Sequence, residues 1–263
     1  MNLRNHLYCL IIGVCWLGSC TDDLVPIDYS EINPSIFPKT EADLQAMVNA
    51  CYYPLRGSWG DGIYSTSERG VMFVSDATTE ILHGKYGVQN VASLHNYIPA
   101  TTDITRFYDD FQNMISRMTL TIDLINEADV SETLKRSAIA EVRCARGLLA
   151  YQLFDFFGPI VIAPLEVLKN PLIEEPLARL SHEETVNFIE ADLIAAAEDL
   201  PGPAEAEYGR FSKGLANMLL IRLNLHEKRW DKVVERCDDI IGYNYYVIDN
   251  DYVGMWDLEG AKG

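Results

Sequence analysis

Cysteine is scarce in the mature part of this 263-residue sequence. Of six cysteines, two lie within the first 19 residues and a third, Cys20, follows directly. The other three, Cys51, Cys144 and Cys237, are an odd number at wide spacing. This arrangement does not indicate a framework of paired disulfides, and it favours three small core residues.

Basic residues are also few. The sequence has 21 Lys and Arg against 39 Asp and Glu, which gives a formal net charge of −18. This balance argues against nucleic acid and anionic lipid surfaces as partners, because both would be repelled. It is compatible with a neutral ligand and with exposure to the outside of a cell. Apolar residues make up 48% of the chain, so a substantial core can form.

Motifs for catalysis and cofactor binding are lacking as well. His182–Glu184 does not extend to a metalloprotease motif, and Gly57–Gly62 follows a predicted helix and not a strand. No Gly-x-Ser-x-Gly sequence occurs. Asp249–Asp251 resembles the start of a calcium loop, but Gly260 stands where the bidentate Glu is needed. We therefore expect no enzyme activity, no cofactor and no metal.

The chain has one long apolar run, at residues 7–17, preceded by Arg4. The run is too short to span a bilayer but suits a signal peptide. It ends in Leu17-Gly18-Ser19-Cys20, the pattern that lipoprotein processing recognises. We predict a signal peptide over 1–19, a lipid anchor on Cys20 and a polar tether over 20–39. An ordinary secretory signal is the alternative.

The rest of the chain, residues 40–263, has mainly helical spacing. The pattern predicts helices at 40–52, 103–128, 131–157, 181–200, 212–227 and 230–241, with capping boxes at Thr40/Asp43 and Ser181/Glu184. The last two form a predicted antiparallel pair, with Gly242 expected at the C-cap. Four apolar residues are expected to line its interface: Val233, Val234, Cys237 and Ile240. Helix pairs of this size suggest tetratricopeptide-like units.

Two stretches interrupt the helical pattern. Residues 57–102 contain six glycines with scattered aromatics and histidines, and only Val71–Val74 suggests a short strand. Residues 158–180 contain four prolines, which predicts a connector without helix. Long irregular segments often have a functional role, so residues 57–102 are the predicted binding region.

The sequence Ala140–Gly158, AEVRCARGLLAYQLFDFFG, resembles the signature helix of the SusD/RagB family. Glu141, Arg143 and Arg146 occupy its Ala-Glu-x-Arg-x-x-Arg positions, and Gly147 stands where Ala is common. We expect both arginines to link this helix to its neighbours through charged hydrogen bonds, and do not expect them to bind an anion. Further similarities are Ser75-Asp76, the IEADL…LP helix at 189–201, GRFSKGLA at 209–216 and RWDK at 229–232.

This resemblance implies an α-helical SusD-like fold with tetratricopeptide-like helix pairs. It implies an outer-membrane lipoprotein at the cell surface that captures glycans, or peptides in the RagB branch, for a SusC-like TonB-dependent transporter, without catalysis. The acidic residues after Cys20 also resemble the surface-export signal of Bacteroidota lipoproteins. Family members are considerably longer, so we expect that a C-terminal half of the family pattern is missing here.

The ligand-binding candidates lie in the irregular segment. A neutral sugar has an apolar face that stacks on an aromatic ring and hydroxyls that bond to Asn or His. The side chains that fit are Trp59, Tyr64, His83, Tyr86, Asn90, His95, Asn96 and Tyr97. Some of these aromatics could instead attach the loops to the helices.

Two other functions stay open. The helical repeats could form a lipid-anchored scaffold for another protein, and a lipid-anchored hydrolase is the third hypothesis. A purified protein that turned over polysaccharide would favour the hydrolase.

Overall fold

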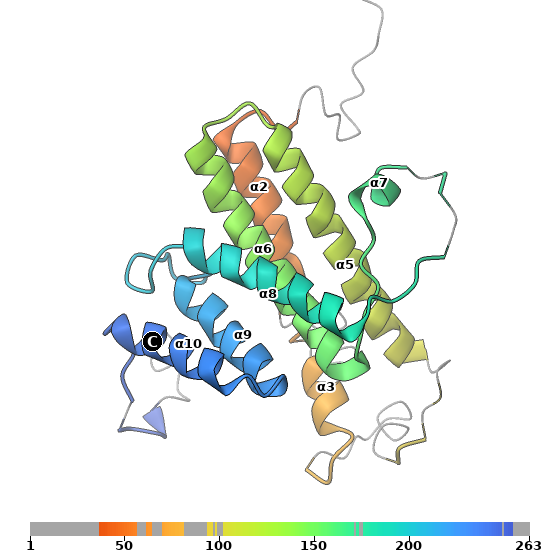
Figure 1. The fold of residues 1–263 in the computed structure, drawn as a ribbon, viewed down its shortest axis with the longest axis vertical. Coiled ribbons are helices and arrows are strands. Elements are labelled where there is room, and N and C mark those ends of the chain that lie inside the picture. The colour runs from red at the N-terminus through yellow and green to blue at the C-terminus, as the bar shows by residue number, and fades with distance from the viewer. Residues whose placement is uncertain are drawn as a thin grey trace, which may run out of the picture. The chain divides into compact units, whose positions relative to one another are not determined.

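The computed structural model describes residues 37–56, 62–64, 70–81, 94–96, 98, 102–170, 172–173, 176–248 and 250–254 (Figure 1). The chain divides into two units, Met1–Phe37 and Pro38–Gly263, and the fold described below is that of the second. The predicted signal peptide, Cys20 and most of the predicted tether lie outside the described residues.

The described part of the chain contains helices and no strand, which confirms the mainly helical pattern predicted from the sequence. Helix borders agree with the predicted ones within one or two residues. In chain order the elements are α2 (Glu41–Tyr52), the 3-10 helix η1 (Tyr53–Leu55), α3 (Val71–Asp76), α5 (Thr102–Glu127), α6 (Glu132–Phe157), α7 (Leu165–Leu168), α8 (His182–Asp199), α9 (Lys213–His226) and α10 (Trp230–Gly242).

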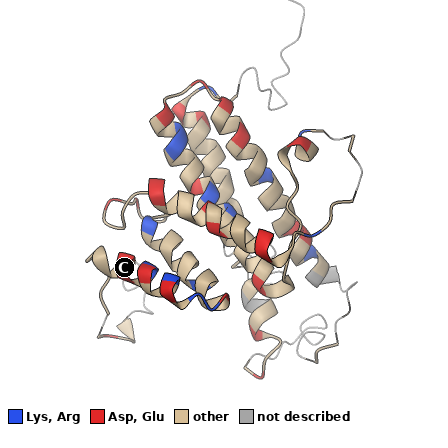
Figure 2. Cartoon of the chain, viewed as in Figure 1, with Lys and Arg blue, Asp and Glu red and all other residues tan. Residues whose placement is uncertain are grey.

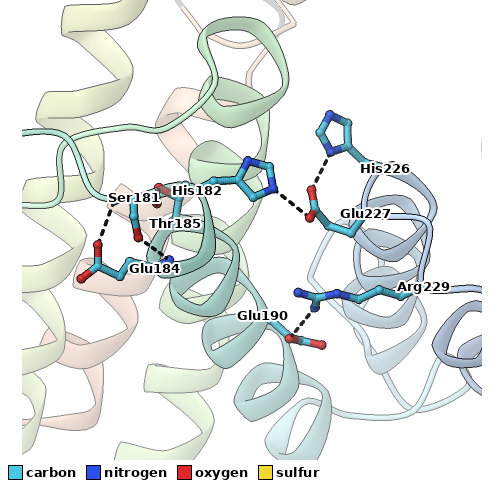
Figure 3. Close-up of polar contacts among 8 residues, drawn as sticks. All are labelled: Ser181, His182, Glu184, Thr185, Glu190, His226, Glu227 and Arg229. Carbon is cyan, nitrogen blue, oxygen red and sulfur yellow. Dashed lines mark hydrogen bonds and ion pairs between the residues drawn. The ribbon is translucent and has the colours of Figure 1, made fainter.

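Both predicted capping boxes are present. The Thr40 hydroxyl accepts from the Asp43 N–H at 3.2 Å, and the Asp43 carboxylate accepts from the Thr40 N–H at 2.9 Å. Ser181 and Glu184 make the same exchange at α8 (Figure 3). Hydrogen bonds from the side chain and the backbone N–H of Ser181 hold the pKa of Glu184 below its usual value. These caps satisfy N–H groups that a helix start leaves unpaired.

Helix α6 is the centre of the fold. It packs against α5, α8 and α2, and more lightly against α9. Its buried side chains therefore occur around much of its circumference and not along a single stripe. Gly147 allows α8 to come close, because a Cβ there would lie 2.8 Å from Leu193 Cδ2. The core continues into α8 and α9 through Val186, Ile189, Leu220 and Leu223.

A polar cluster joins the start of α8 to the end of α9. The two oxygens of Glu227 bond to His182 Nε2 and His226 Nδ1, each at 2.9 Å (Figure 3). Both imidazoles also meet the Phe154 ring edge-on, at centroid distances of 5.2 and 5.1 Å. Arg229 donates to Glu190 of α8 at 3.0 Å. These contacts fix how α8 and α9 are stacked at this end of the pair.

Helix α10 packs on α9, and no residue of α10 is buried. The prediction that Val234 faces α9 is wrong, because that side chain is 60% exposed. Val233, Cys237 and Ile240 are partly covered. Charged residues are distributed over several helices and are not confined to α10 (Figure 2).

Three local predictions are wrong. Val71–Val74 is part of helix α3 and not a strand, since a short apolar run has no periodicity that separates the two. The 158–180 connector contains the one-turn helix α7, which begins directly after Pro164. Gly242 is the last helical residue and not the cap, and Asn244 takes the left-handed conformation at φ 51°.

Candidate functional site

A hollow of about 340 Å³ lies where α2, α6 and the start of α9 meet. Its lining consists of Tyr52, Leu55, Arg56, Tyr64, Leu148, Gly209, Phe211 and Leu215. The helices supply the floor, and Tyr64 comes from the segment predicted to bind ligand. The volume lies at the small end of the range of about 300–1,000 Å³ that is typical of ligand sites.

The floor of the hollow is a stacked pair of rings. Tyr52 and Phe211 lie 4.4 Å apart with an interplanar angle of 25°. The Tyr52 hydroxyl accepts from the Phe211 N–H at 2.9 Å and donates to Glu141. Burial, followed by the hydrogen bond to Glu141, raises the pKa of the Tyr52 phenol above its usual value. Tyr52 is therefore a neutral, fixed part of the wall.

Arg210 completes this network beneath the rings. Its guanidinium donates to Glu141 at 2.8 Å and to Asn49 at 2.7 Å, and it lies 4.8 Å from the centre of the Tyr52 ring. The Glu141–Arg210 pair is largely shielded from solvent. Two parts of the SusD-like pattern that are 69 residues apart thus meet in one ion pair, whose role is to hold α6 against the start of α9.

The two arginines of the signature helix, Arg143 and Arg146, differ in their hydrogen bonds. Arg146 donates to both oxygens of Asp192 on α8, at 2.7 and 2.8 Å, and to Thr119 on α5 at 2.8 Å. This confirms the predicted link between helices. For Arg143, the buried Nε has no hydrogen-bond partner within the part of the chain described here, and the link predicted for this residue stays a prediction.

The predicted ligand-binding residues are only partly described. Tyr64 lines the hollow, and its side chain is 54% exposed. His95 and Asn96 do not line it, and His95 Nε2 lies 2.7 Å from the carbonyl oxygen of Thr78. His95 therefore holds a turn, as its φ of 53° also indicates. The remaining candidates lie outside the described residues: Trp59, His83, Tyr86, Asn90 and Tyr97.

Tyr64 differs from the other aromatic residues of the hollow. The Tyr52 and Phe211 rings stack on each other, and the Tyr52 hydroxyl accepts a hydrogen bond from the Phe211 N–H. For Tyr64, the described residues provide neither a hydrogen bond nor a ring contact. An exposed ring over an apolar hollow can stack on a ligand without first breaking an internal contact.

Sequence reasoning missed Tyr52 and Phe211 as site residues. Tyr52 is the last residue of the helix predicted at 40–52, and Phe211 lies within the GRFSK motif, so neither position by itself indicates a binding site. The two are 159 residues apart, so no local pattern could show that they stack. The signal available in the sequence is the SusD-like resemblance at GRFSK. It marks this segment as part of the family pattern but does not identify the residues that the segment contacts.

A second hollow, of about 530 Å³, lies between α5 and the end of α2. Its apolar lining includes Cys51, Pro54, Met114, Met118 and Leu124. Burial raises the pKa of the Cys51 thiol to about 12, so the thiol stays protonated and unreactive. This hollow lacks the stacked rings of the first, and the ring of its exposed tyrosine, Tyr53, is covered by the Arg56 guanidinium at 3.7 Å from the ring centre.

In the described part of the chain, no three His, Cys, Asp or Glu side chains are placed to hold a metal ion. No described helix is both long enough and apolar enough to cross a bilayer.

Comparison with known proteins decides the family. The model of a SusD-like family, described as "Starch-binding associating with outer membrane", matches residues 28–225. The chain belongs to this SusD-like family. The resemblance found in the sequence is thereby confirmed, as is the α-helical SusD-like fold.

Three relatives illustrate the similarity. A SusD-like protein P25 of Formosa agariphila is 23% identical, over all of this chain and 53% of its own length. A SusD homologue of Bacteroides thetaiotaomicron superposes with a TM-score of 0.70 at 16% identity, over 86% of this chain and 45% of its own. The surface glycan-binding protein A of Bacteroides fluxus gives 0.63 at 24% identity, over 84% and 48%. This SusD-like chain spans about half the length of these relatives.

Proposed function

We propose that this SusD-like chain binds a neutral glycan at the cell surface and passes it to a SusC-like TonB-dependent transporter in the outer membrane. Membership of a family described as starch-binding and associated with the outer membrane supports this. A structural relative is named as a glycan-binding protein of the cell surface. The proposal is one of binding and transfer, without catalysis.

The observation on which the proposal rests is the exposed ring of Tyr64 over the apolar hollow. The C–H face of a pyranose can stack on this ring while the Tyr52–Phe211 pair supports the sugar from below. Such a hollow accommodates one or two sugar units at the end or bend of a chain. The chain's strong negative charge does not oppose this, because the ligand is neutral.

The proposed site extends into the segment that contains Trp59 and Tyr86. These aromatics are close to Tyr64 in sequence and would supply further stacking along an oligosaccharide. His83, Asn90 and Tyr97 would bond its hydroxyls. Their role rests on residue type and on neighbourhood in the sequence.

Calorimetry with maltoheptaose and laminariheptaose tests glycan binding. Replacing Tyr64 with Ala should weaken the association by about two- to tenfold, since a stacking aromatic contributes about 0.5–1.5 kcal/mol. Tyr245→Ala is the matched control, because Tyr245 is 52% exposed and does not line the hollow. Equal losses in both variants, or no binding of any glycan by the unaltered protein, would contradict the proposal.

We further propose that a lipid on Cys20 anchors the protein, with residues 20–39 as the tether. Several acyl chains hold a protein stably because each buried methylene contributes about 0.8 kcal/mol. Cys20→Ser should give an unprocessed protein without acyl mass in mass spectrometry. A mature protein that begins elsewhere and has no acyl group would contradict this part of the proposal.

A further inference from the structure

The backbone of Ile63 joins two other parts of the chain beside the first hollow. Its N–H donates to the carbonyl oxygen of Pro54 in η1 at 2.6 Å, and its carbonyl accepts from the N–H of Val71, the first residue of α3, at 2.8 Å. The Ile63 side chain has no exposed surface. Both polar groups of its backbone are therefore paired and its side chain is buried. Together these contacts form an anchor at Ile63.

Gly62 lets the chain reach the Ile63 anchor. Its φ is 96°, a conformation that residues with a side chain rarely adopt. A Cβ at this position would also overlap the backbone carbonyl oxygen of Arg56, which cannot rotate away as the end of a side chain could. The backbone at Gly62 thus approaches the end of η1 more closely than any other residue type would allow.

The residue that follows the anchor is Tyr64. Leu55 and Arg56 directly follow Pro54, and they line the hollow together with Tyr64. The hydrogen bond from Ile63 to Pro54 therefore joins the two stretches of chain that bring these three side chains to the same space. Adjacent Cα atoms lie about 3.8 Å apart, so fixing Ile63 also restricts where the Tyr64 backbone can lie.

We propose that the Ile63 anchor is a positioning device for glycan binding, in which Gly62 and Ile63 hold the Tyr64 ring at the hollow before the ligand arrives. The inference rests on the proposed function, in which Tyr64 stacks on a sugar. A side chain that is already in place loses less conformational freedom on binding, so more of the stacking energy contributes to affinity. Gly62 and Ile63 do not line the hollow and act only through Tyr64.

Gly62→Ala is the first variant that should release the anchor. The added Cβ forces the backbone to move at Gly62 or at Arg56, because the two cannot overlap. Gly158→Ala is the matched control, since Gly158 also has a positive φ, at 69°, yet a Cβ there meets no atom within 4 Å. Gly158 caps α6 and does not line the hollow. The two variants separate loss of the anchor from backbone strain in general.

Val71→Pro is the second variant and acts on the other side of Ile63. It removes the N–H that donates to the Ile63 carbonyl, at the first residue of α3, where proline is otherwise compatible with a helix. Glu132→Pro is the matched control at the first residue of α6. In the described part of the chain the Glu132 N–H makes no backbone hydrogen bond, so this proline removes no equivalent contact.

Amide hydrogen exchange in the absence of glycan measures the anchor itself. The Ile63 N–H should be protected in the unaltered protein, because its exchange requires the hydrogen bond to Pro54 to open. Gly62→Ala and Val71→Pro should each make this proton exchange at least about tenfold faster, and the two controls should leave its rate unchanged. The same rate in every variant would overturn the proposal. Circular dichroism verifies that each variant is folded.

Calorimetry with maltoheptaose and laminariheptaose measures the consequence for binding. Gly62→Ala and Val71→Pro should weaken association by about two- to tenfold, as Tyr64→Ala does, and the two controls should not. In the Tyr64→Ala background neither variant should weaken binding further, because the ring that the anchor holds is absent. Equal losses in both backgrounds would indicate a general structural defect and would contradict a positioning role.

The two measurements separate this inference from the proposed function. If Tyr64→Ala weakens glycan binding while Gly62→Ala and Val71→Pro bind as tightly as the unaltered protein, the anchor does not position the ring and the inference is wrong. If the unaltered protein binds neither glycan, the proposed function is contradicted. Faster exchange of the Ile63 N–H in the two variants would then still show that this residue fixes its segment.

Discussion

Helices α6 and α10 both have apolar side chains at helical spacing, yet they end in opposite environments. Thirteen residues of α6 are buried, and none of α10 is. The difference does not lie in how strongly the sequence separates apolar from charged residues, since α10 separates them more sharply than α6 does. The difference lies in the number of neighbouring helices. Four helices contact α6, whereas α10 packs on α9.

The comparison shows that an amphipathic pattern predicts a helix and the side it can bury, but not whether that side is covered. It also separates two kinds of family residue. Arg146 and Glu141 hold helices together, while the ring of Tyr64 is exposed beside the hollow. Four experiments test the comparison, in descending order of the expected effect.

Removing the buried partner of Arg146 should have the largest effect. Asp192→Ala leaves a shielded guanidinium without its carboxylate, which should lower the free energy of unfolding by about 3–5 kcal/mol. Arg136→Ala breaks the exposed pair with Asp199 and should cost much less, because solvent screens an exposed ion pair. Urea denaturation measures both variants. Similar losses would show that burial does not separate the two pairs.

Truncating one aliphatic side chain in each helix compares the two environments directly. Leu149 on α6 is fully buried, so Leu149→Ala should cost about 2–5 kcal/mol. Val234→Ala removes exposed methyl groups and should change stability by less than about 0.5 kcal/mol. Thermal and urea midpoints provide the measurement. A large cost for Val234→Ala would mean that this side chain is packed against other residues in solution.

The close approach of α6 and α8 at Gly147 is a third test. Gly147→Val places methyl groups against Leu193 and should cost about 1–3 kcal/mol through overpacking. Combining it with Leu193→Ala should cost less than the sum of the two single changes, since the smaller side chain makes room. Strict additivity in urea denaturation would exclude a steric conflict between these two positions.

Acid should affect the α8–α9 junction, with the smallest of the four effects. Burial alone would raise the pKa of Glu227, but hydrogen bonds from His182 and His226 outweigh it and lower the pKa below its ordinary value of 4.5. Its stabilising contribution is therefore complete above pH 4.5 and is lost as the pH falls through the lowered folded-state pKa. Glu227→Gln should be less stable than the unaltered protein at pH 6, and the gap in thermal midpoint should close towards pH 3. A gap that is constant over this range would contradict the assigned ionisation.

The sequence alone determined much of this protein. Apolar spacing located the long helices, because a 3.6-residue period over many residues outweighs local irregularity. Ser181 and Glu184 identified a helix start, since a capping box is made by residues three apart. The motifs around Arg146 identified the family, which the comparison then confirmed.

Tertiary structure decided what local patterns could not. Four apolar residues at Val71–Val74 fit a strand or a helix equally well, and only packing selected the helix. Tyr52, Glu141 and Phe211 meet across as many as 159 residues of sequence, and such contacts leave no periodic signal. The exposure of Tyr64 is likewise a result of which neighbours are present, because burial depends on the whole arrangement of helices and not on any one of them.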